Sequence, residues 1–498
     1  MMKTMLLVAA GLTVGISATA QTYAHYMTTE DGEWQQSKLT LAGKAATAPI
    51  VSLTGQEQGH AFRAWGTCFN ELDLDALEML QPDEQEEVMH RLFAPDGDLR
   101  FTRGRLTMNA NDYSRAWYSC DTVDGDFQLR HFNIEHDKAN VIRLIRKAQR
   151  HQPQMTFWVS PWSPPAWMKI NHDYPVMSSR WNRLPKEKDA LLFDGGAVDE
   201  TEVMNAGQQA GNLFPRRLAT QDYFIQDARY MQAYANMFCR FIELYAEENI
   251  PIDMVMYQNE AYSYTPYPGC AWTAEGTLRF NRDYLIPTLQ KQHPDVDVHI
   301  GTLNTNRLHY VTQFIDGLQH QVKGIGLQWE GRDIIDSLRH RYPDLRLIST
   351  ESECGNGQMD WRAGEHTFHL LADYIGRGCD EYYIWNFILC NQGQSAWGWK
   401  QNALIQVQSE NRSHRYTAEF YAVKHFSHFV EPGSQMLSYV SREQNGGVPL
   451  IVFRRPDRKY VVIAGNQTDE QRTFTIKMGK KHLNMVLPAH SFHTFISK

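Results

Sequence analysis

Short apolar runs alternate with amphipathic stretches along most of this chain. The apolar runs are typical of buried strands, and most are followed by apolar residues at helical spacing, as in residues 138–150. A strand–helix unit that repeats in this way predicts a parallel sheet, and eight such units predict a closed (β/α)8 TIM barrel. The expected strands lie at residues 60–69, 99–108, 155–162, 253–260, 297–304, 323–331, 345–350 and 380–388.

Two segments outside this alternation have a different pattern. Residues 21–57 are polar with short strand-like runs, and residues 431–498 alternate strands with turns. We expect an all-β sandwich domain built from both chain ends, with the α/β barrel, residues 58–430, inserted between its parts. Residues 170–222 form a long insert after the third barrel strand, and long loops in compact domains are often functional.

The first twenty residues have the pattern of a secretory signal peptide. Lys3 precedes an apolar core at residues 5–16 that is short for a bilayer span, and Ala18 and Ala20 fit a cleavage site. Cleavage near Ala20 would export the protein to the periplasm or the extracellular space. No later apolar run is long enough to span a membrane, so no transmembrane segment is expected after signal removal.

Net charge and cysteine spacing give no support for binding of nucleic acid or of a metal ion. A formal net charge of -8 gives no support for nucleic-acid binding, which needs a basic footprint. The seven cysteines are scattered, and no cysteine or histidine cluster has the spacing of a metal site. We therefore expect no metal and no cofactor, mostly buried thiols, and room for one or two disulfides. The sequence does not indicate an oligomeric state.

Two of the apolar runs end in acidic residues. Residues 253–260 finish in Gln258, Asn259 and Glu260, and residues 345–351 finish in Glu351. In such barrels the active site lies at the carboxyl ends of the strands, so polar and aromatic residues at these ends are candidates. The candidates are Arg105, Asp112, Trp162, Asn259, Glu260, Trp329, Glu330, Glu351 and Trp385.

This mixture of side chains suits a sugar substrate. Each residue alone could be a turn, packing or loop residue, but together at one rim they offer carboxylates and amides for hydroxyl groups and indole planes for sugar rings. Two carboxyl groups that flank a glycosidic bond can split it, one as general acid and the other as nucleophile. Glu260 and Glu351 face each other across a narrow barrel, so a retaining arrangement, with carboxyls about 5–5.5 Å apart, is geometrically reasonable.

The same residues carry a family resemblance. Residues 105–134, 158–169, 256–260, 347–355, 382–387 and 419–435 resemble, in order, landmarks of glycoside hydrolase family 30. That family includes lysosomal glucosylceramidase and microbial β-1,6-glucanases. The resemblance implies a (β/α)8 barrel with an attached β-sandwich, which agrees with the pattern of apolar runs.

The resemblance also implies individual roles. Glu260 is the expected acid/base and Glu351 the expected nucleophile, with Asn259 contacting the 2-hydroxyl of the substrate. Arg105 matches an arginine of the second strand. The sugar-binding positions implied by the family are Asp112, Trp162 and Trp385.

Three departures from the family pattern affect these expectations. Ala261 stands where the family usually has proline, which changes a loop. Gln328, Trp329 and Glu330 replace the His-Trp-Tyr of glucosylceramidase, so a third carboxylate could bind a sugar hydroxyl or perturb a catalytic pKa. Glu353, two residues after Glu351, is a rival nucleophile, and we expect Glu351 to fill the role.

The expected function is a retaining O-glycosyl hydrolase that acts on β-linked oligo- or polysaccharide, with a β-1,6-glucanase or β-glucosidase as the first choice. One alternative is glucosylceramidase or another exo-β-glycosidase, such as a fucosidase, galactosidase or xylosidase. Another alternative, from a different class, is a carbohydrate-binding protein without catalysis. Linkage depends on loops, above all residues 170–222 and 391–400, and chain-end preference is left open.

Overall fold

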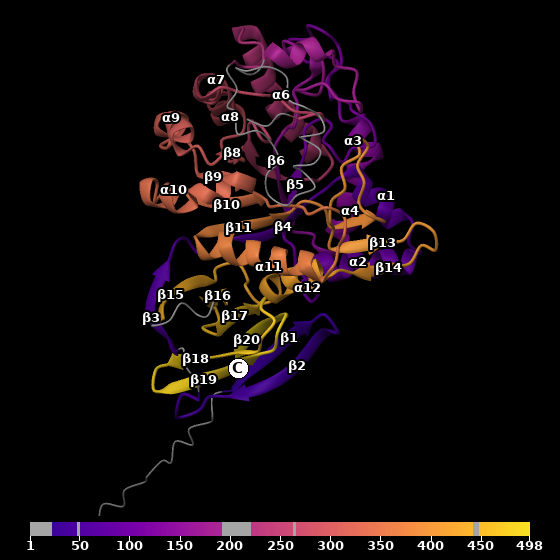
Figure 1. The fold of residues 1–498 in the computed structure, drawn as a ribbon. Helices are drawn as coiled ribbons and strands as arrows, with labels where there is room; N and C mark the ends of the chain where they lie inside the picture. Colours follow the sequence, from indigo (N-terminus) through magenta and orange to yellow (C-terminus); the bar gives the residue numbers. More distant parts are fainter. Residues whose placement is uncertain (1–21, 47–49, 192–220, 262–264, 442–447) are drawn as a thin grey trace, which may run out of the picture.

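The computed structural model describes residues 22–46, 50–191, 221–261, 265–441 and 448–498 and shows a barrel joined to a β domain (Figure 1). Eight parallel strands form the barrel, which closes where β11 pairs with β4. The predicted fold class is therefore confirmed. The barrel strands are β4 (Ala64–Cys68), β5 (Arg103–Leu106), β6 (Thr156–Val159), β7 (Ile252–Met256), β8 (Asp297–Leu303), β9 (Gly324–Gln328), β10 (Arg346–Glu351) and β11 (Cys379–Ile384).

The inside of the barrel is filled by side chains in layers. Arg103 lies low in the barrel, where it donates to Asp253 at 2.9 Å and to the Tyr383 hydroxyl at 3.0 Å. A cluster of Trp158, Met254, Met256, Ile348 and Tyr383 packs above it. Gly66 leaves room for Tyr383, because a Cβ at that position would lie 2.4 Å from the ring. This packed floor leaves the upper rim as the place for a site.

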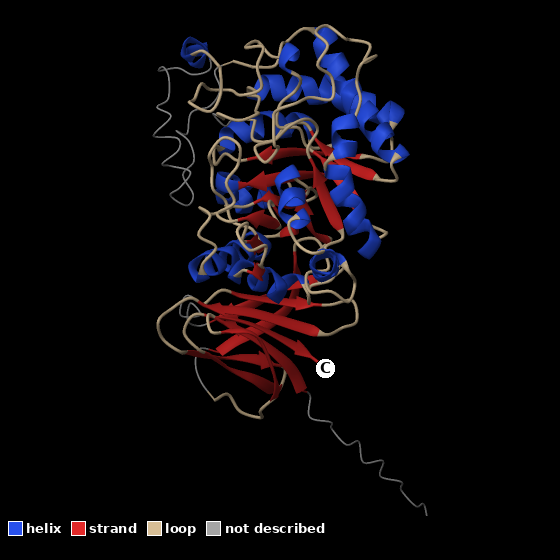
Figure 2. Cartoon of the chain, turned by 90° about the vertical axis from the view of Figure 1, so that its right-hand side faces the viewer, coloured by secondary structure: helices blue, strands red, loops and turns tan. Residues whose placement is uncertain are grey.

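Helices connect the strands and surround the barrel (Figure 2). Pro82 stands at the start of α2, which divides the helical stretch after β4 into two helices. The described helices are α1 (Glu71–Glu78), α2 (Pro82–Phe93), α3 (Glu135–Ala139), α4 (Val141–His151), α6 (Ala228–Glu247), α7 (Ala274–Phe280), α8 (Ile286–Gln292), α9 (Leu308–Leu318), α10 (Ile335–Arg341), α11 (Trp361–Gly376) and α12 (Ala418–Ser427).

The β domain is a nine-stranded sheet in the order β19-β18-β3-β15-β16-β17-β20-β1-β2, so it contains strands from both parts of the sequence, with β3 between C-terminal strands. Its apolar faces enclose a second core that includes Tyr23, Val462 and Phe495. The strands are β1 (Thr22–Thr29), β2 (Gly32–Thr40), β3 (Ile50–Gln58), β15 (Gln435–Ser441), β16 (Leu450–Arg454), β17 (Tyr460–Asn466), β18 (Arg472–Met478), β19 (Lys481–Leu487) and β20 (Ser491–Ser497).

Helices α11 and α12 lie between the barrel and this sheet (Figure 1). The Phe368 ring on α11 stacks on Phe492 of β20 with centroids 4.8 Å apart. On α12, the two ring nitrogens of the buried His425 lie 2.9 Å from the Thr494 hydroxyl and 3.0 Å from the Thr28 hydroxyl. A small sheet of β12 (Ile388–Cys390), β13 (Ile405–Val407) and β14 (His414–Tyr416) follows the barrel.

Three histidines near this junction predict acid sensitivity of the folded state, His425 and His493 being buried and His25 half-buried. Burial lowers the pKa of His25 to about 4, and burial holds the pKa values of His425 and His493 well below 6.5. An unfolded chain would protonate these rings near pH 6.5 while the folded protein keeps them neutral. The stability they allow is therefore present above pH 6.5 and is lost progressively as the pH falls towards 4.

Thermal unfolding between pH 7.5 and 4.5 should show this as a difference between variants, because buried carboxyl groups such as Glu419, whose pKa burial raises to about 7, act in the opposite direction. The melting temperature of His25→Gln should fall less on acidification than that of wild type, because the variant lacks one of the three groups. The same dependence on pH in both proteins would contradict the assignment.

The expectations for the cysteines and for membrane-spanning helices concern described residues, whereas the one for the signal peptide does not. All seven cysteines are free thiols, six of them buried and Cys390 half-buried. No described helix has the length and apolar character that crossing a membrane requires. The predicted signal peptide, residues 1–20, lies outside the described residues, as does most of the insert after β6, at residues 192–220.

Candidate active site

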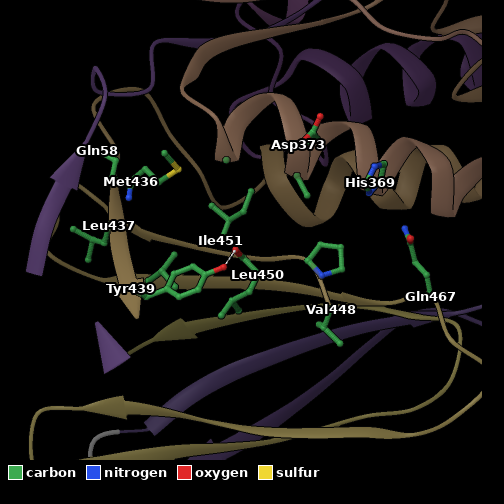
Figure 3. Close-up of a pocket in the computed structure, with 14 residues that line it drawn as sticks. Gln58, His369, Asp373, Met436, Leu437, Tyr439, Val448, Leu450, Ile451 and Gln467 are labelled. Atoms are coloured by element: carbon green, nitrogen blue, oxygen red, sulfur yellow. Dashed lines mark hydrogen bonds between the residues drawn. The ribbon is translucent and has the colours of Figure 1, made fainter. Parts of the chain in front are cut away.

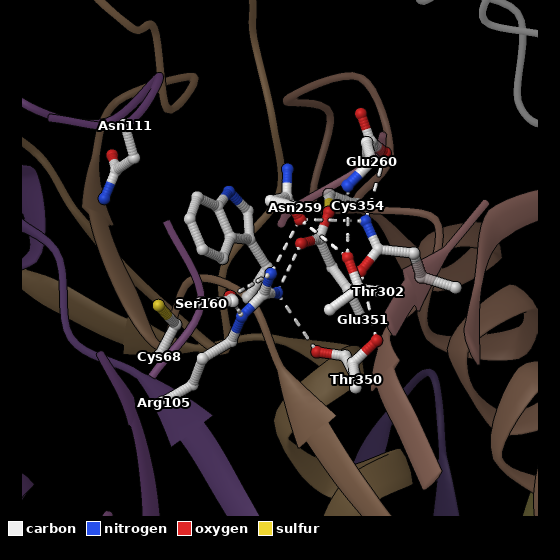
Figure 4. Close-up of polar contacts among 12 residues, drawn as sticks. Cys68, Arg105, Asn111, Ser160, Asn259, Glu260, Thr302, Thr350, Glu351 and Cys354 are labelled. Carbon is white, nitrogen blue, oxygen red and sulfur yellow. Dashed lines mark hydrogen bonds and ion pairs between the residues drawn. The ribbon is translucent and has the colours of Figure 1, made fainter. Parts of the chain in front are cut away.

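The barrel strands bring most of the predicted candidates to one rim. Arg105 lies on β5 and Glu351 is the last residue of β10, whereas Asn259 and Glu260 follow β7 and Gln328 ends β9. Because parallel strands all end at the same side of a barrel, residues far apart in the sequence become neighbours there. Figure 4 shows the polar contacts among them.

Arg105 is at the centre of this rim. Its side chain is fully buried and donates to Glu351 Oε2 at 2.7 Å and to Asn259 Oδ1 at 2.7 Å. It also contacts the Ser160 hydroxyl at 3.2 Å, and its guanidinium lies 4.4 Å from the centroid of the Trp162 ring. A buried guanidinium needs such partners, because burying an unpaired charge is costly.

Both oxygens of Glu351 receive a hydrogen bond. Arg105 donates to Oε2, and the indole nitrogen of Trp329 donates to Oε1 at 3.1 Å. Burial raises the pKa of Glu351 above its usual range, while the Arg105 charge and these two hydrogen bonds act in the opposite direction. The carboxylate is thus fixed in orientation, and Arg105 favours its ionised form.

Replacing Arg105 with methionine should shift the acidic limb of the activity profile to higher pH. Without the guanidinium the pKa of Glu351 rises further, and activity that needs the ionised form is lost at a higher pH. We expect kcat/KM at neutral pH to fall about 10²-fold or more. Arg105→Lys, which keeps the charge, should move the limb less. An unmoved acidic limb in the folded methionine variant would contradict this role.

Asn259 and Glu260 are held by a second set of contacts. Asn259 Oδ1 accepts from Arg105, from the Thr302 hydroxyl at 3.0 Å and from Gln328 Nε2 at 3.2 Å, so its Nδ2 points away from this network (Figure 4). Glu260 Oε1 accepts from Gln328 Nε2 at 3.1 Å, and Oε2 accepts from the Tyr267 hydroxyl at 3.3 Å.

The backbone of Glu260 is also constrained. Its φ of 46° lies in the left-handed region, which non-glycine residues adopt at a cost of roughly 1–2 kcal/mol. The Glu260 N–H donates to the Thr302 hydroxyl at 3.2 Å, which helps to hold this conformation. The left-handed turn directs the side chain across the rim rather than along the strand.

Glu260 and Glu351 line the same narrow cavity. Its volume is about 10 Å³, room for about one water molecule. A sugar ring is larger, so the side chains around this cavity have to move apart when a ring enters. The lining residues are Asp112, Trp162, Asn259, Glu260, Tyr267, Trp329, Glu351, Trp397, Trp399 and Gln401.

Asp112 contributes a third carboxyl group to this cavity. It is 5% exposed, and its Oδ1 is buried without a hydrogen-bond partner in the described part of the chain. Burial raises the pKa of Asp112 well above its ordinary value, and the neighbouring Glu351 raises it further. An unpaired oxygen at a cavity wall is suited to accept a hydrogen bond from a substrate hydroxyl.

Three acidic or aromatic residues considered from the sequence lie elsewhere. Trp385 stacks behind Trp162, with centroids 4.9 Å apart, and lines a neighbouring small cavity. Glu330 is half-buried and does not line the cavity that holds Glu260 and Glu351. Glu353 points into different cavities, with its Oε1 3.5 Å from Arg332, which separates it from Glu351.

Several cavity residues were not individual candidates in the sequence. Tyr267 follows β7 in a loop, and its contact with Glu260 has no signal in the chain. Gln328 does not line the cavity but contacts Asn259 and Glu260, and in the sequence it was a strand-end residue and a departure from the family pattern, not a site candidate. The aromatic residues Trp397 and Trp399 and the amide of Gln401 lie in or just after the loop 391–400, whose two tryptophans were its one signal.

A larger cavity lies away from this rim, between α11 and the β domain (Figure 3). Its volume is about 620 Å³, and the residues around it include Tyr439, Ile451 and Gln467. Among its described lining residues Asp373 is the one carboxylate, and it lies within 3.5 Å of both Arg332 and Arg377, so they offer no pair of carboxylates. Among the described residues, no cluster of three or more His, Cys, Asp or Glu could hold a metal ion.

Two family models match this chain. The model of the Glycosyl hydrolase family 30 TIM-barrel domain matches residues 62–179 and 223–430. The model of the Glycosyl hydrolase family 30 beta sandwich domain matches residues 433–495. Together these matches cover most of the barrel and the C-terminal strands of the β domain.

Individual relatives are distant but span nearly the whole chain. Lysosomal acid glucosylceramidase of Mus musculus is 22% identical, over 95% of this chain and 89% of that protein. Endo-1,6-beta-D-glucanase neg1 of Aspergillus fumigatus is 21% identical, over 95% of this chain and 94% of that protein. A solved endo-β-1,6-glucanase structure is 18% identical with a TM-score of 0.76, covering 95% of this chain and 98% of that one. At this identity the structural likeness shows the fold alone.

Proposed function

Because the chain belongs to glycoside hydrolase family 30, whose members hydrolyse O-glycosyl bonds, we propose that it is a retaining β-glycosidase that cleaves β-glucan, with β-1,6 linkages as the first choice. One observation carries the mechanism: Glu260 and Glu351 line one cavity but have different partners. Glu351 is paired with a guanidinium, whereas Glu260 contacts a neutral amide and a phenol. Different surroundings give two carboxyl groups different roles.

Glu351 is the nucleophile in this proposal. Arg105 favours its ionised form, and Trp329 holds the other oxygen, so the carboxylate is oriented before substrate binds. It attacks the anomeric carbon and forms a covalent glycosyl–enzyme ester as the bond to the leaving oxygen breaks. The ester is then cleaved by water, which restores the carboxylate and the starting anomeric configuration.

Glu260 is the acid/base. In the first step its carboxyl group gives a proton to the glycosidic oxygen, so the leaving sugar departs as a neutral alcohol. In the second step the resulting carboxylate takes a proton from the attacking water. Asn259 lines the same cavity and uses its Oδ1 for Arg105, so we assign its Nδ2 to a sugar hydroxyl as donor, and Asp112 Oδ1 to one as acceptor.

The choice of β-glucan rests on the relatives and on the aromatic walls of the cavity. Endo-1,6-beta-D-glucanase neg1 matches 95% of this chain in sequence, and the solved endo-β-1,6-glucanase shares the fold over 95% of it. Trp162, Trp397 and Trp399 present flat apolar surfaces of the kind on which sugar rings pack.

Incubation of the purified protein with defined β-1,6-, β-1,3- and β-1,4-glucans tests the proposal. We expect release of short sugars from the β-1,6-glucan, and NMR of the first product should show a retained β anomer. An α anomer as the first product would refute the double displacement, and no cleavage of any β-glucan would refute the substrate class.

The relatives also support a second candidate, an exo-acting β-glycosidase such as a glucosylceramidase, fucosidase, galactosidase or xylosidase, because lysosomal acid glucosylceramidase of Mus musculus matches 95% of this chain. A panel of nitrophenyl β-glycosides beside the glucans separates the two, because an exo-enzyme releases monosaccharide only. A carbohydrate-binding protein without catalysis would bind the glucan and release nothing.

We further propose that the protein is exported by the signal at residues 1–20. N-terminal sequencing of the protein recovered from its native cells should then begin near Gln21. Recovery of the intact N-terminus would refute export by this route.

A further inference from the structure

A chain of hydrogen bonds runs from Glu351 through Arg105, Asn259 and Gln328 to Glu260. The donor and the acceptor of each bond can be assigned by starting from Arg105, because a guanidinium has N–H donors and no acceptor. The Asn259 atom that lies 2.7 Å from Arg105 must therefore be the carbonyl oxygen Oδ1. The Thr302 hydroxyl, 3.0 Å away, donates to the same oxygen.

Because Asn259 Oδ1 is an acceptor, the Gln328 atom next to it must be the donor Nε2. Its Nε2 lies 3.2 Å from Asn259 Oδ1 and 3.1 Å from Glu260 Oε1, so its two hydrogens serve these two acceptors. Its own carbonyl oxygen accepts from the Thr350 hydroxyl at 3.1 Å. A flipped amide would place its oxygen against the acceptor oxygens of both Asn259 and Glu260, and this repulsion fixes the orientation. The fully buried Gln328 is thus fixed as a donor towards Glu260.

We propose that Gln328 confines the catalytic proton of Glu260 to Oε2, and that Arg105 sets this choice through Asn259. The inference rests on the proposed function, in which Glu260 is the acid/base. Oε1 accepts an N–H that cannot turn away, so a proton on Oε1 would face another hydrogen. Oε2 has a partner that adapts: the Tyr267 hydroxyl, 3.3 Å away, can donate to the carboxylate or accept from the acid.

The proton then leaves from and returns to the same oxygen. In the first step the Oε2–H bond breaks as the glycosidic oxygen gains the proton, the bond from C1 to that oxygen breaks, and the bond from C1 to Glu351 forms. In the second step water forms a bond to C1, the bond from C1 to Glu351 breaks, and the water proton goes to Oε2. Gln328 acts through Glu260 and is a positioning residue.

The first test compares pH profiles of wild type and Gln328→Met, which has a similar length but no donor. A hydrogen bond donated to a carboxylate favours the ionised form, so its loss raises the pKa of the acid. The basic limb of kcat/KM should move up by about one pH unit. With poor leaving groups, which need the proton, kcat/KM at the optimum should fall up to about tenfold. With 2,4-dinitrophenyl glycosides it should change little.

Tyr267→Phe is the matched control at the other oxygen of the same carboxyl group. The phenol stabilises both forms of Glu260, so its loss should move the basic limb less than the loss of Gln328. Gln328→Met with an unmoved limb and equal losses for good and poor leaving groups would overturn the proposal.

A readout without turnover separates this inference from the proposed function. Carbon-13 labelling of glutamate, assigned with Glu260→Gln, gives the titration of the Glu260 carboxyl carbon by NMR. A higher pKa in Gln328→Met supports the inference, and an unchanged pKa refutes it. If wild type cleaves no glycoside, the proposed function fails and this titration still decides the hydrogen-bond polarity.

Discussion

Glu351→Gln should lower kcat/KM for every substrate by about 10⁴-fold or more, the order of loss that follows when a covalent nucleophile is removed. Glutamine keeps the shape of the side chain but cannot form the glycosyl ester. Arg105 and Trp329 both donate to Glu351, and the amide nitrogen of glutamine would face one of these donors. Binding of sugar should persist while turnover is lost, which calorimetry and product analysis can measure separately.

Glu353→Gln is the matched control for this prediction. It lies two residues further along, is 8% exposed and contacts Arg332 in other cavities. Its replacement should leave kcat close to wild type, although stability can change. Smaller loss in Glu351→Gln than in Glu353→Gln would show that the two roles were assigned the wrong way round. Azide added to Glu351→Ala should restore activity and yield an α-glycosyl azide.

Glu260→Gln should show a loss that depends on the leaving group. For glucan or alkyl glycosides, which depart only when protonated, we expect kcat/KM to fall about 10²–10⁴-fold. For 2,4-dinitrophenyl glycosides the first step should stay fast, so the glycosyl enzyme accumulates and a burst of dinitrophenol precedes slow turnover. Stopped-flow absorbance measures the burst, and mass spectrometry detects the ester on Glu351.

External azide separates the two carboxylates further. In Glu260→Gln, azide attacks the glycosyl–enzyme ester without help from a general base, so added azide should speed turnover. The product should be a β-glycosyl azide, the opposite anomer to that expected from Glu351→Ala. An equal loss for good and poor leaving groups, with no burst, would contradict the acid/base role of Glu260.

The barrel was predictable because each strand and helix has its own local pattern. A strand such as β9 is buried along its whole length and is apolar up to Gln328, its last residue. The polar residues at the ends of such strands then stand out, which is why Glu260 and Glu351 could be paired from the sequence. The predicted catalytic roles and sugar contacts stay predictions until the substitutions above are made.

Contacts made by loops could not be predicted in the same way. The bond between Tyr267 and Glu260 depends on the path of the loop after β7, and Trp397 reaches the cavity from the segment after β12. Neither path has a periodic signal. Glu330 was predicted at the site but does not line the cavity. The left-handed φ of 47° at Trp329 turns the chain just before Glu330. A turn of this kind removes the face expected from strand alternation.

The pairing of β1 with β20 has a consequence for biosynthesis. Tyr23 lies opposite Ser497, so β1, which is translated first, can pair with β20 only after translation has nearly finished. Barrel strands can pair as they leave the ribosome, but β1 and β2 have no place in their sheet until β20 exists. Nascent chains therefore carry unpaired edges through most of translation, which makes early chaperone contact at the first strands an expected part of maturation.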